Sequence, residues 1–137
     1  MHPTPPPPSP QNVRDALGRI LGSPQFRSAA RQRQFLAYVV EETLAGRSDQ
    51  LKEWSIARGG LGEPTNFDPR TDPLVRVLAG RVRASLAKYY AGSGADDPVR
   101  IDVPKGSYAT THIWAGDASD HRERHTVGPR LAVLSFV

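Results

Sequence analysis

The sequence predicts a mainly α-helical domain that ends in a C-terminal β-hairpin. Two observations carry this prediction: apolar residues recur at helical spacing in several segments before residue 92, and a period-two segment around a Pro-Lys-Gly turn follows them. The chain has 137 residues, of which 38% are hydrophobic, enough for one domain of ordinary size. We expect three to four helices and a two-stranded hairpin within residues 11–114.

The first ten residues, MHPTPPPPSP, hold six of the thirteen prolines. We predict that residues 1–10 form a disordered, solvated tail, and a docking peptide for a proline-binding partner is the alternative. This end lacks the cationic and apolar regions of a signal peptide, and no apolar run reaches the roughly 20 residues that span a bilayer. Because the chain also has no cysteine, we expect a cytoplasmic protein with no disulfide and no membrane contact.

Two helices are predicted before residue 47. Ser9 and Pro10 supply an N-cap and a first-turn proline for the first helix, which ends at Gly22. The second helix begins near Ser28, and Gly46 ends it. The apolar residues that recur at helical spacing, and that we expect to be buried, are Val13, Ala16, Leu17, Ile20 and Leu21 in the first helix and Phe35, Leu36, Val39, Val40 and Leu44 in the second.

A short third helix is predicted after Asp49, before Gly59 and Gly60 break it. The segment GGLGEPTNFDPRT that follows has three glycines and two prolines and should be irregular. The residues that this helix is expected to bury are Leu51, Trp54 and Ile56.

The fourth helix, residues 73–91, has a buried and an exposed side. Asp72 followed by Pro73 is a strong helix start, and Gly92 is a stop. At 100° per residue, one arc of apolar side chains should face the core. These residues are Val75, Leu78, Ala79, Val82, Leu86 and Tyr89.

Small residues lie opposite that arc, between two pairs of cations seven residues apart. Arg76 and Arg83 flank the small residues on one side, and Arg81 and Lys88 flank them on the other. Small side chains let a helix enter a groove, while cations on both edges reach phosphates. A helix–helix packing face, as in a homodimer, is the alternative. The small residues are Val77, Gly80, Ala84 and Ala87.

The hairpin is predicted from VRIDVPKGSYATTHIW, residues 99–114. Apolar residues alternate with polar ones in its first half, and Pro104 with Gly106 favours a tight turn. Lys105 is therefore expected at the tip, where a cation can reach a phosphate or a minor groove. An exposed lysine kept for solubility is the alternative. We expect Tyr108 to anchor the return strand against the helix.

This order of helices, basic helix and hairpin resembles the winged helix-turn-helix effector domains of OmpR/PhoB-type response regulators. The residues that carry the resemblance are Arg81, Arg83 and Leu86, then Lys105, Gly106 and Tyr108. Residues 11–113 are also similar to the N-terminal module of bacterial multidomain proteins that join it to TolB-like, adenylate-cyclase-type or tetratricopeptide regions. The segments concerned are FLAYVVEETLAGRSDQLKEWSIA, FDPRTDPLVRVLAGRVRASLAKYY and VRIDVPKGSY. The resemblance implies a winged-helix fold that binds DNA.

Two features differ from the response-regulator domains. Nothing before Val13 can form the small sheet that opens those domains, and the module has no phosphoacceptor domain. Residues 115–129 are polar and are predicted to be a linker. The tail LAVLSF resembles the first strand of a TolB-like region, with Ser135 where a proline is usual. We therefore predict residues 130–137 as the first strand of a truncated following domain.

No catalytic or metal-binding set is evident in the sequence, so we predict a protein that is not an enzyme and has no cofactor. His121 and His125 are four apart but lie in the polar segment HRERH, which is not a zinc-protease pattern. The segment RGGLGEP lacks the Lys and Ser or Thr that complete a phosphate-binding loop.

We predict a module of a bacterial transcription regulator that binds duplex DNA, with helix 73–91 in the major groove and the hairpin tip on the backbone or minor groove. The net charge of +4 and its segregation along the chain favour a polyanion as partner, and a pair of solvated helix faces is the alternative interpretation of the charge. The alternative function is a non-catalytic signalling or protein-interaction module. The residues predicted to contact DNA, mainly at phosphates, are Arg76, Arg81, Arg83, Lys88 and Lys105.

Overall fold

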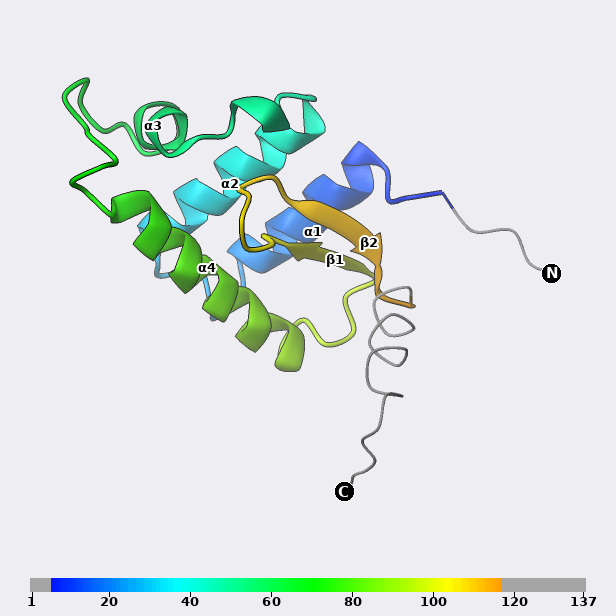
Figure 1. Cartoon of the computed structure of the whole chain (residues 1–137). Helices are drawn as coiled ribbons and strands as arrows, with labels where there is room; N and C mark the ends of the chain where they lie inside the picture. Colours follow the sequence, from blue (N-terminus) through cyan, green and yellow to red (C-terminus); the bar gives the residue numbers. More distant parts are fainter. Residues whose placement is uncertain (1–5, 117–137) are drawn as a thin grey trace, which may run out of the picture.

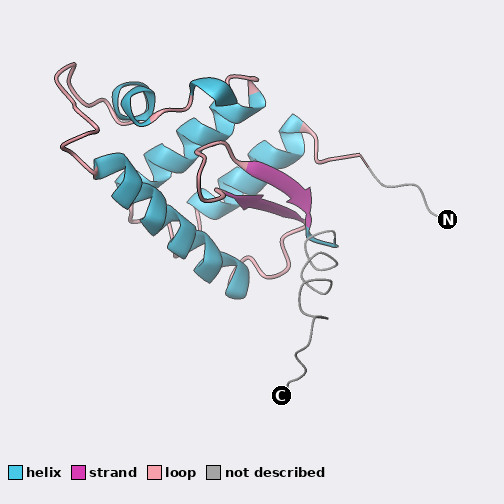
Figure 2. Cartoon of the chain, in the orientation of Figure 1, coloured by secondary structure: helices cyan, strands magenta, loops and turns pink. Residues whose placement is uncertain are grey.

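The computed structural model describes residues 6–116 (Figures 1 and 2). This part is mainly helical with one two-stranded antiparallel sheet, which confirms the coarse fold prediction. Nearly all of the predicted linker and the strand predicted at 130–137 lie outside the described residues. The elements, in order, are α1 (Pro10–Leu21), α2 (Ala30–Leu44), a 3₁₀ turn η1 (Ser48–Gln50), α3 (Glu53–Ser55), a π-helical turn η2 (Ile56–Gly60), α4 (Leu74–Ala91), β1 (Val99–Asp102) and β2 (Thr111–Trp114).

Helix α2 is the central element, because it contacts α1, α4, η1 and η2. Strand β1 packs on α1. In Figure 1 the hairpin lies in front of α1, and α4 lies to the lower left of the hairpin. Buried apolar side chains from α1, α2, α4, β1 and the segment between α2 and α4 form one core. Within residues 6–116, no helix is both long and apolar enough to cross a membrane.

Helix α1 starts as predicted. The Ser9 hydroxyl accepts a hydrogen bond from the Asn12 backbone N–H at 3.1 Å, and the Asn12 side chain accepts from the Ser9 backbone N–H. This reciprocal cap and Pro10 in the first turn satisfy the helix start without tertiary help. The predicted apolar residues of α1 are buried, except that Leu21 is only partly so.

The end of the predicted tail lies against the folded domain. Pro8 is buried, and the indole N–H of Trp114 donates to the Pro6 carbonyl at 2.7 Å. A proline-rich segment has no internal hydrogen bonds, so its carbonyls are available to donors elsewhere. Pro6 thus contacts the end of β2, whereas residues 1–5 lie outside the described part.

Helix α2 buries four of its five predicted apolar residues fully, and Leu44 partly. The region of the third predicted helix differs more from expectation. Leu51 and Ile56 are buried, but Trp54 is 50% exposed, so the prediction that it is buried was wrong. The α-helical part spans only Glu53–Ser55 before the π turn begins, which directs Trp54 outward. The Arg58 guanidinium covers its ring at 5.3 Å from the centroid.

Gly59 and Gly60 belong to the π turn instead of ending a helix before it. The ring of Tyr38 lies directly against both. A Cβ atom on Gly59 would lie 2.7 Å from the Tyr38 hydroxyl oxygen, and one on Gly60 would lie 2.9 Å from Tyr38 Cγ. These glycines therefore serve the close approach of α2 to η2.

Helix α4 confirms the predicted helical periodicity. All six residues of the predicted arc are buried, and the Asp72 carboxylate accepts from the Leu74 backbone N–H at 3.0 Å at the helix start. The preceding loop is irregular, as expected, and packs Phe67 into the core.

The hairpin has the predicted strands but a longer connection. The ladder runs from Val99 opposite Trp114 to Asp102 opposite Thr111 and then stops. Residues 103–110, which we name the hairpin loop, connect the strands. The connection is therefore longer than predicted, although the turn lies at Lys105 and Gly106 as expected. Gly106 has the positive φ of 89° expected at a turn. The Tyr108 ring packs edge-on against Phe35 of α2, with centroids 6.2 Å apart. This contact draws the loop away from strand pairing.

Candidate nucleic-acid interface

The side of α4 opposite the core is uncovered in the described part of the chain. We call its small residues, Val77, Gly80, Ala84 and Ala87, the open face. All four are exposed, and Val77 is 47% exposed. A Cβ atom built on Gly80 would meet no atom within 4 Å. The open face is therefore accessible to a partner.

Two of the predicted cations, Arg81 and Lys88, lie at one edge of the open face. Both are exposed, and neither forms an ion pair or side-chain hydrogen bond within residues 6–116. Ser85, between them in sequence, donates its hydroxyl to the Gln32 side chain at 2.7 Å, which ties this edge to α2. Both charged groups are thus carried by a helix that packs on α2, and they are free to bind an anion.

Arg83, at the other edge, is held by the hairpin loop. Its Nε donates to the Val103 carbonyl at 2.7 Å, and Nη2 donates to the carbonyls of Pro104 at 3.3 Å and Ser107 at 3.4 Å. Hydrogen bonds from a charged donor are stronger than neutral ones. Arg83 therefore connects α4 to the hairpin loop and sets the position of that loop.

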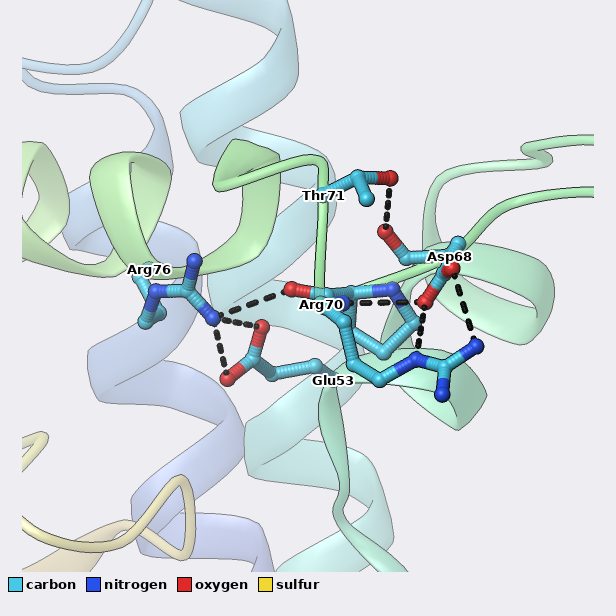
Figure 3. A network of polar contacts seen from close by, with 6 residues as sticks. Glu53, Asp68, Arg70, Thr71 and Arg76 are labelled. Atoms are coloured by element: carbon cyan, nitrogen blue, oxygen red, sulfur yellow. Dashed lines mark hydrogen bonds and ion pairs between the residues drawn. The ribbon is translucent and has the colours of Figure 1, made fainter.

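Arg76 is held by α3 and by the loop before α4 (Figure 3). Its Nη1 donates to both carboxylate oxygens of Glu53, at 2.8 and 3.0 Å, and to the Pro69 carbonyl at 3.2 Å. In the same loop, hydrogen bonds from Arg70 hold the pKa of Asp68 below its ordinary value. Arg76 thus joins three segments at the start of α4.

Lys105 lies in the turn of the hairpin loop, next to Gly106, as predicted. It is exposed and forms no ion pair within the described residues. Because Arg83 binds the carbonyls on both sides of this turn, the position of Lys105 relative to α4 depends on Arg83.

The structure therefore divides the five predicted cations into two groups. Arg81, Lys88 and Lys105 are exposed and unpaired within residues 6–116, whereas Arg76 and Arg83 make internal contacts. Spacing along a helix indicates which edge a residue occupies, but not which partner from elsewhere in the chain reaches it. Sequence reasoning also gave no role to Lys52 and Glu53, and their only signal was alternating charge in the segment DQLKE.

A buried carboxylate supports the other end of α4. Asp97 accepts hydrogen bonds from Arg19 at 2.9 and 3.0 Å, from the Tyr89 hydroxyl at 2.9 Å and from the Val99 backbone N–H at 3.1 Å. Burial acts to raise the pKa of Asp97, but these hydrogen bonds outweigh it and hold the pKa below its ordinary value. Burial and this acceptor raise the pKa of Tyr89 to about 12. The cluster joins α1, α4 and β1.

Within residues 6–116, no three His, Cys, Asp or Glu side chains are placed to hold a metal ion together. Comparison of the chain with protein-family models, with curated proteins and with solved structures found no match. We therefore base the function on the geometry and charge of α4 and the hairpin loop.

Proposed function

We propose that residues 11–114 form a winged helix-turn-helix domain that binds duplex DNA, as a module of a bacterial transcription regulator. One observation carries this proposal. The open face of α4 is uncovered, unpaired cations lie at its edge, and the hairpin loop beside it has another cation at its turn. In the complex, α4 would enter the major groove and Lys105 would contact the adjacent backbone or minor groove.

The chemistry of the open face favours contacts with the DNA backbone over recognition of the base sequence. Gly80, Ala84 and Ala87 let the helix backbone approach the groove floor, but they offer few polar groups to base edges. Arg81 and Lys88 can neutralise phosphates at the groove wall, which gives affinity that does not depend on sequence. We therefore expect a module whose binding responds more to salt than to base composition.

Arg76 and Arg83 have a positioning role in this proposal. Arg83 holds the hairpin loop beside α4, and Arg76 holds α3 and the preceding loop at the helix start. Arg83 still adds to the positive potential, because hydrogen bonds to carbonyls do not remove its charge, whereas the ion pair with Glu53 offsets the charge of Arg76.

The test is the affinity for a random-sequence duplex, measured by fluorescence anisotropy over a series of salt concentrations. We expect log K to fall steeply with log salt, and Arg81→Ala to make the slope shallower by about one. Arg14→Ala is the matched control, because Arg14 lies on α1 in an exposed ion pair with Glu41. It should leave the slope nearly unchanged. An absence of binding at low salt would contradict the proposal.

A protein-interaction module is the second candidate function, and the exposure of Val77 favours it. Two open faces can pack together through small residues, and the pairing of Arg76 with Glu53 reduces charge repulsion on one edge. Sedimentation equilibrium distinguishes the two functions. A dimer that dissociates in Val77→Ser would support the packing function, and a monomer that binds DNA would support the first proposal.

A further inference from the structure

An open groove with a cavity volume of about 720 Å³ lies on the flank of α4, separate from the open face. One wall is the segment that contains Asp49, Lys52 and Glu53. Arg76 and Arg83 of α4 and the 106–108 part of the hairpin loop complete the lining. The groove therefore lies where α4, α3 and the hairpin loop meet.

Internal contacts hold the two arginines of the groove in place but leave some of their N–H groups without an acceptor among the described residues. Arg76 makes its described contacts through Nη1 alone, and Arg83 makes its contacts through Nε and Nη2. A guanidinium has five N–H donors, so both retain N–H groups that no residue within 6–116 accepts. Because internal contacts already hold both side chains, little conformational entropy is lost when a ligand binds.

Two further donors line the same groove. Lys52 is exposed, and its ammonium group forms no ion pair within residues 6–116. The Ser107 hydroxyl oxygen accepts from the Ala109 backbone N–H at 3.1 Å, which leaves its O–H free to donate. Several donors that line one groove match a tetrahedral anion with several acceptor oxygens.

The charge of the lining also favours an anion. Lys52, Arg76 and Arg83 give three positive charges against Asp49 and Glu53, a net charge of +1. Glu53 is already paired with Arg76, so Asp49 is the acid that opposes an anion. The Tyr108 phenol adds no charge to the groove at neutral pH, since its ordinary pKa is about 10 and burial raises that pKa further.

We propose that this groove is a phosphate-binding site that holds one phosphate group between Lys52, Arg76 and Arg83. In a complex with duplex DNA, the group would be a backbone phosphodiester lying between α4 and the hairpin loop, and this assignment rests on the proposed function. A free phosphorylated compound offers the same chemistry, so the test has one arm for each source.

The first arm uses inorganic phosphate as the probe. The ¹⁵N-labelled full chain is titrated with phosphate, with chloride at matched ionic strength as the reference. We expect saturable NMR shifts of the Arg83 Nε–H signal and of the Gly106 and Ser107 amides. Lys52→Gln should weaken the phosphate affinity and Asp49→Asn should strengthen it, each by about two- to fivefold, because one charge changes within several ångströms of the ligand.

The controls change the same charge at another place. Asp96→Asn alters the net charge as Asp49→Asn does, and Arg27→Gln alters it as Lys52→Gln does. Neither residue lines the groove, and both are exposed. Both controls should leave the phosphate affinity within the error of the wild type. If the groove signals respond to phosphate no more than to chloride, or if each groove variant behaves like its control, the proposal is wrong.

The second arm uses a random duplex as the probe. Groove signals that shift with DNA, with Lys52→Gln reducing the affinity, assign the site to a backbone phosphate. If DNA shifts the Arg81 and Lys88 signals but not those of the groove, the backbone assignment is wrong while the proposed function stands. If DNA does not bind and phosphate does, the proposed function fails and the phosphate site stands, for a free phosphorylated compound.

Discussion

The two edges of α4 each carry two cationic residues seven positions apart, yet their contacts in the fold differ. Arg81 and Lys88 have no ion pair or side-chain hydrogen bond among residues 6–116, whereas Arg76 and Arg83 hold α3 and the hairpin loop. The difference arises from the neighbours of each edge, since a carboxylate and backbone carbonyls from other segments accept from the arginines of the second edge. A cationic helix can therefore leave the side chains of one edge without internal partners while those of the other edge hold neighbouring segments in place.

The largest expected effect concerns the buried support of α4. Asp97→Asn removes the charge that Arg19 and Tyr89 contact, and should lower the free energy of unfolding by about 2–3 kcal/mol, since Arg19 remains half exposed. Urea denaturation measures this change in the free energy of unfolding. The matched exposed variant Asp96→Asn should change the stability by less than about 0.5 kcal/mol. Equal effects would show that the cluster does not support α4.

The same cluster predicts a pH dependence. The pKa of Asp97 is lower in the folded chain than its ordinary value of about 3.9. A lowered folded-state pKa stabilises the protein above the unfolded-state pKa, and this stabilisation is lost as the pH falls through the folded-state pKa. The stability difference between the wild type and Asp97→Asn should thus be constant from pH 7 to about 5 and narrow below about pH 4. A difference that widens in acid would contradict this assignment.

The next effect tests the supporting edge directly. Arg83→Ala leaves three carbonyls of the hairpin loop without their donor, and should lower the free energy of unfolding by about 1–2 kcal/mol. Arg83→Lys should recover only part of this, because an ammonium group cannot donate in the planar geometry of a guanidinium. Urea denaturation of Arg81→Ala provides the comparison. If Arg81→Ala lowers the free energy of unfolding as much as Arg83→Ala does, the two edges do not differ in their structural role.

The smallest effect concerns the open face. Gly80→Ala should raise the free energy of unfolding by about 0.5–1 kcal/mol, because alanine is the better helix former and its Cβ would meet no atom. Thermal unfolding is the measurement. Ala84→Gly should have the opposite sign and a similar size. If Gly80→Ala destabilises the protein, a part of the chain outside residues 6–116 or a second molecule covers this face.

Local patterns predicted most of the helices, and distant contacts explain what they missed. The buried arc of α4 and the cap of α1 depend only on neighbouring residues, so periodicity and capping rules were sufficient. Trp54 lies in a segment too short for periodicity to decide its side. The length of the hairpin loop depends on Arg83 and Phe35, which are distant in the sequence.

The candidate site was likewise predicted only where it depends on neighbouring residues. Charge and spacing identified the cations of α4, but the groove forms only when Lys52, Arg76 and Ser107 come together from three segments. No local pattern could predict this juxtaposition, because the partner of Arg76 is 23 residues away and that of Arg83 is 20 residues away.

The central claim is that α4 binds duplex DNA, with Arg81 and Lys88 free to contact phosphates and Arg83 holding the hairpin loop in place. The most direct measurement is the salt dependence of DNA affinity for Arg81→Ala/Lys88→Ala and for Arg83→Ala. The double variant should lower the slope of log K against log salt by about two and leave the stability nearly unchanged. Arg83→Ala should lower the stability and change the slope by about one or less. An unchanged slope in the double variant would contradict the claim.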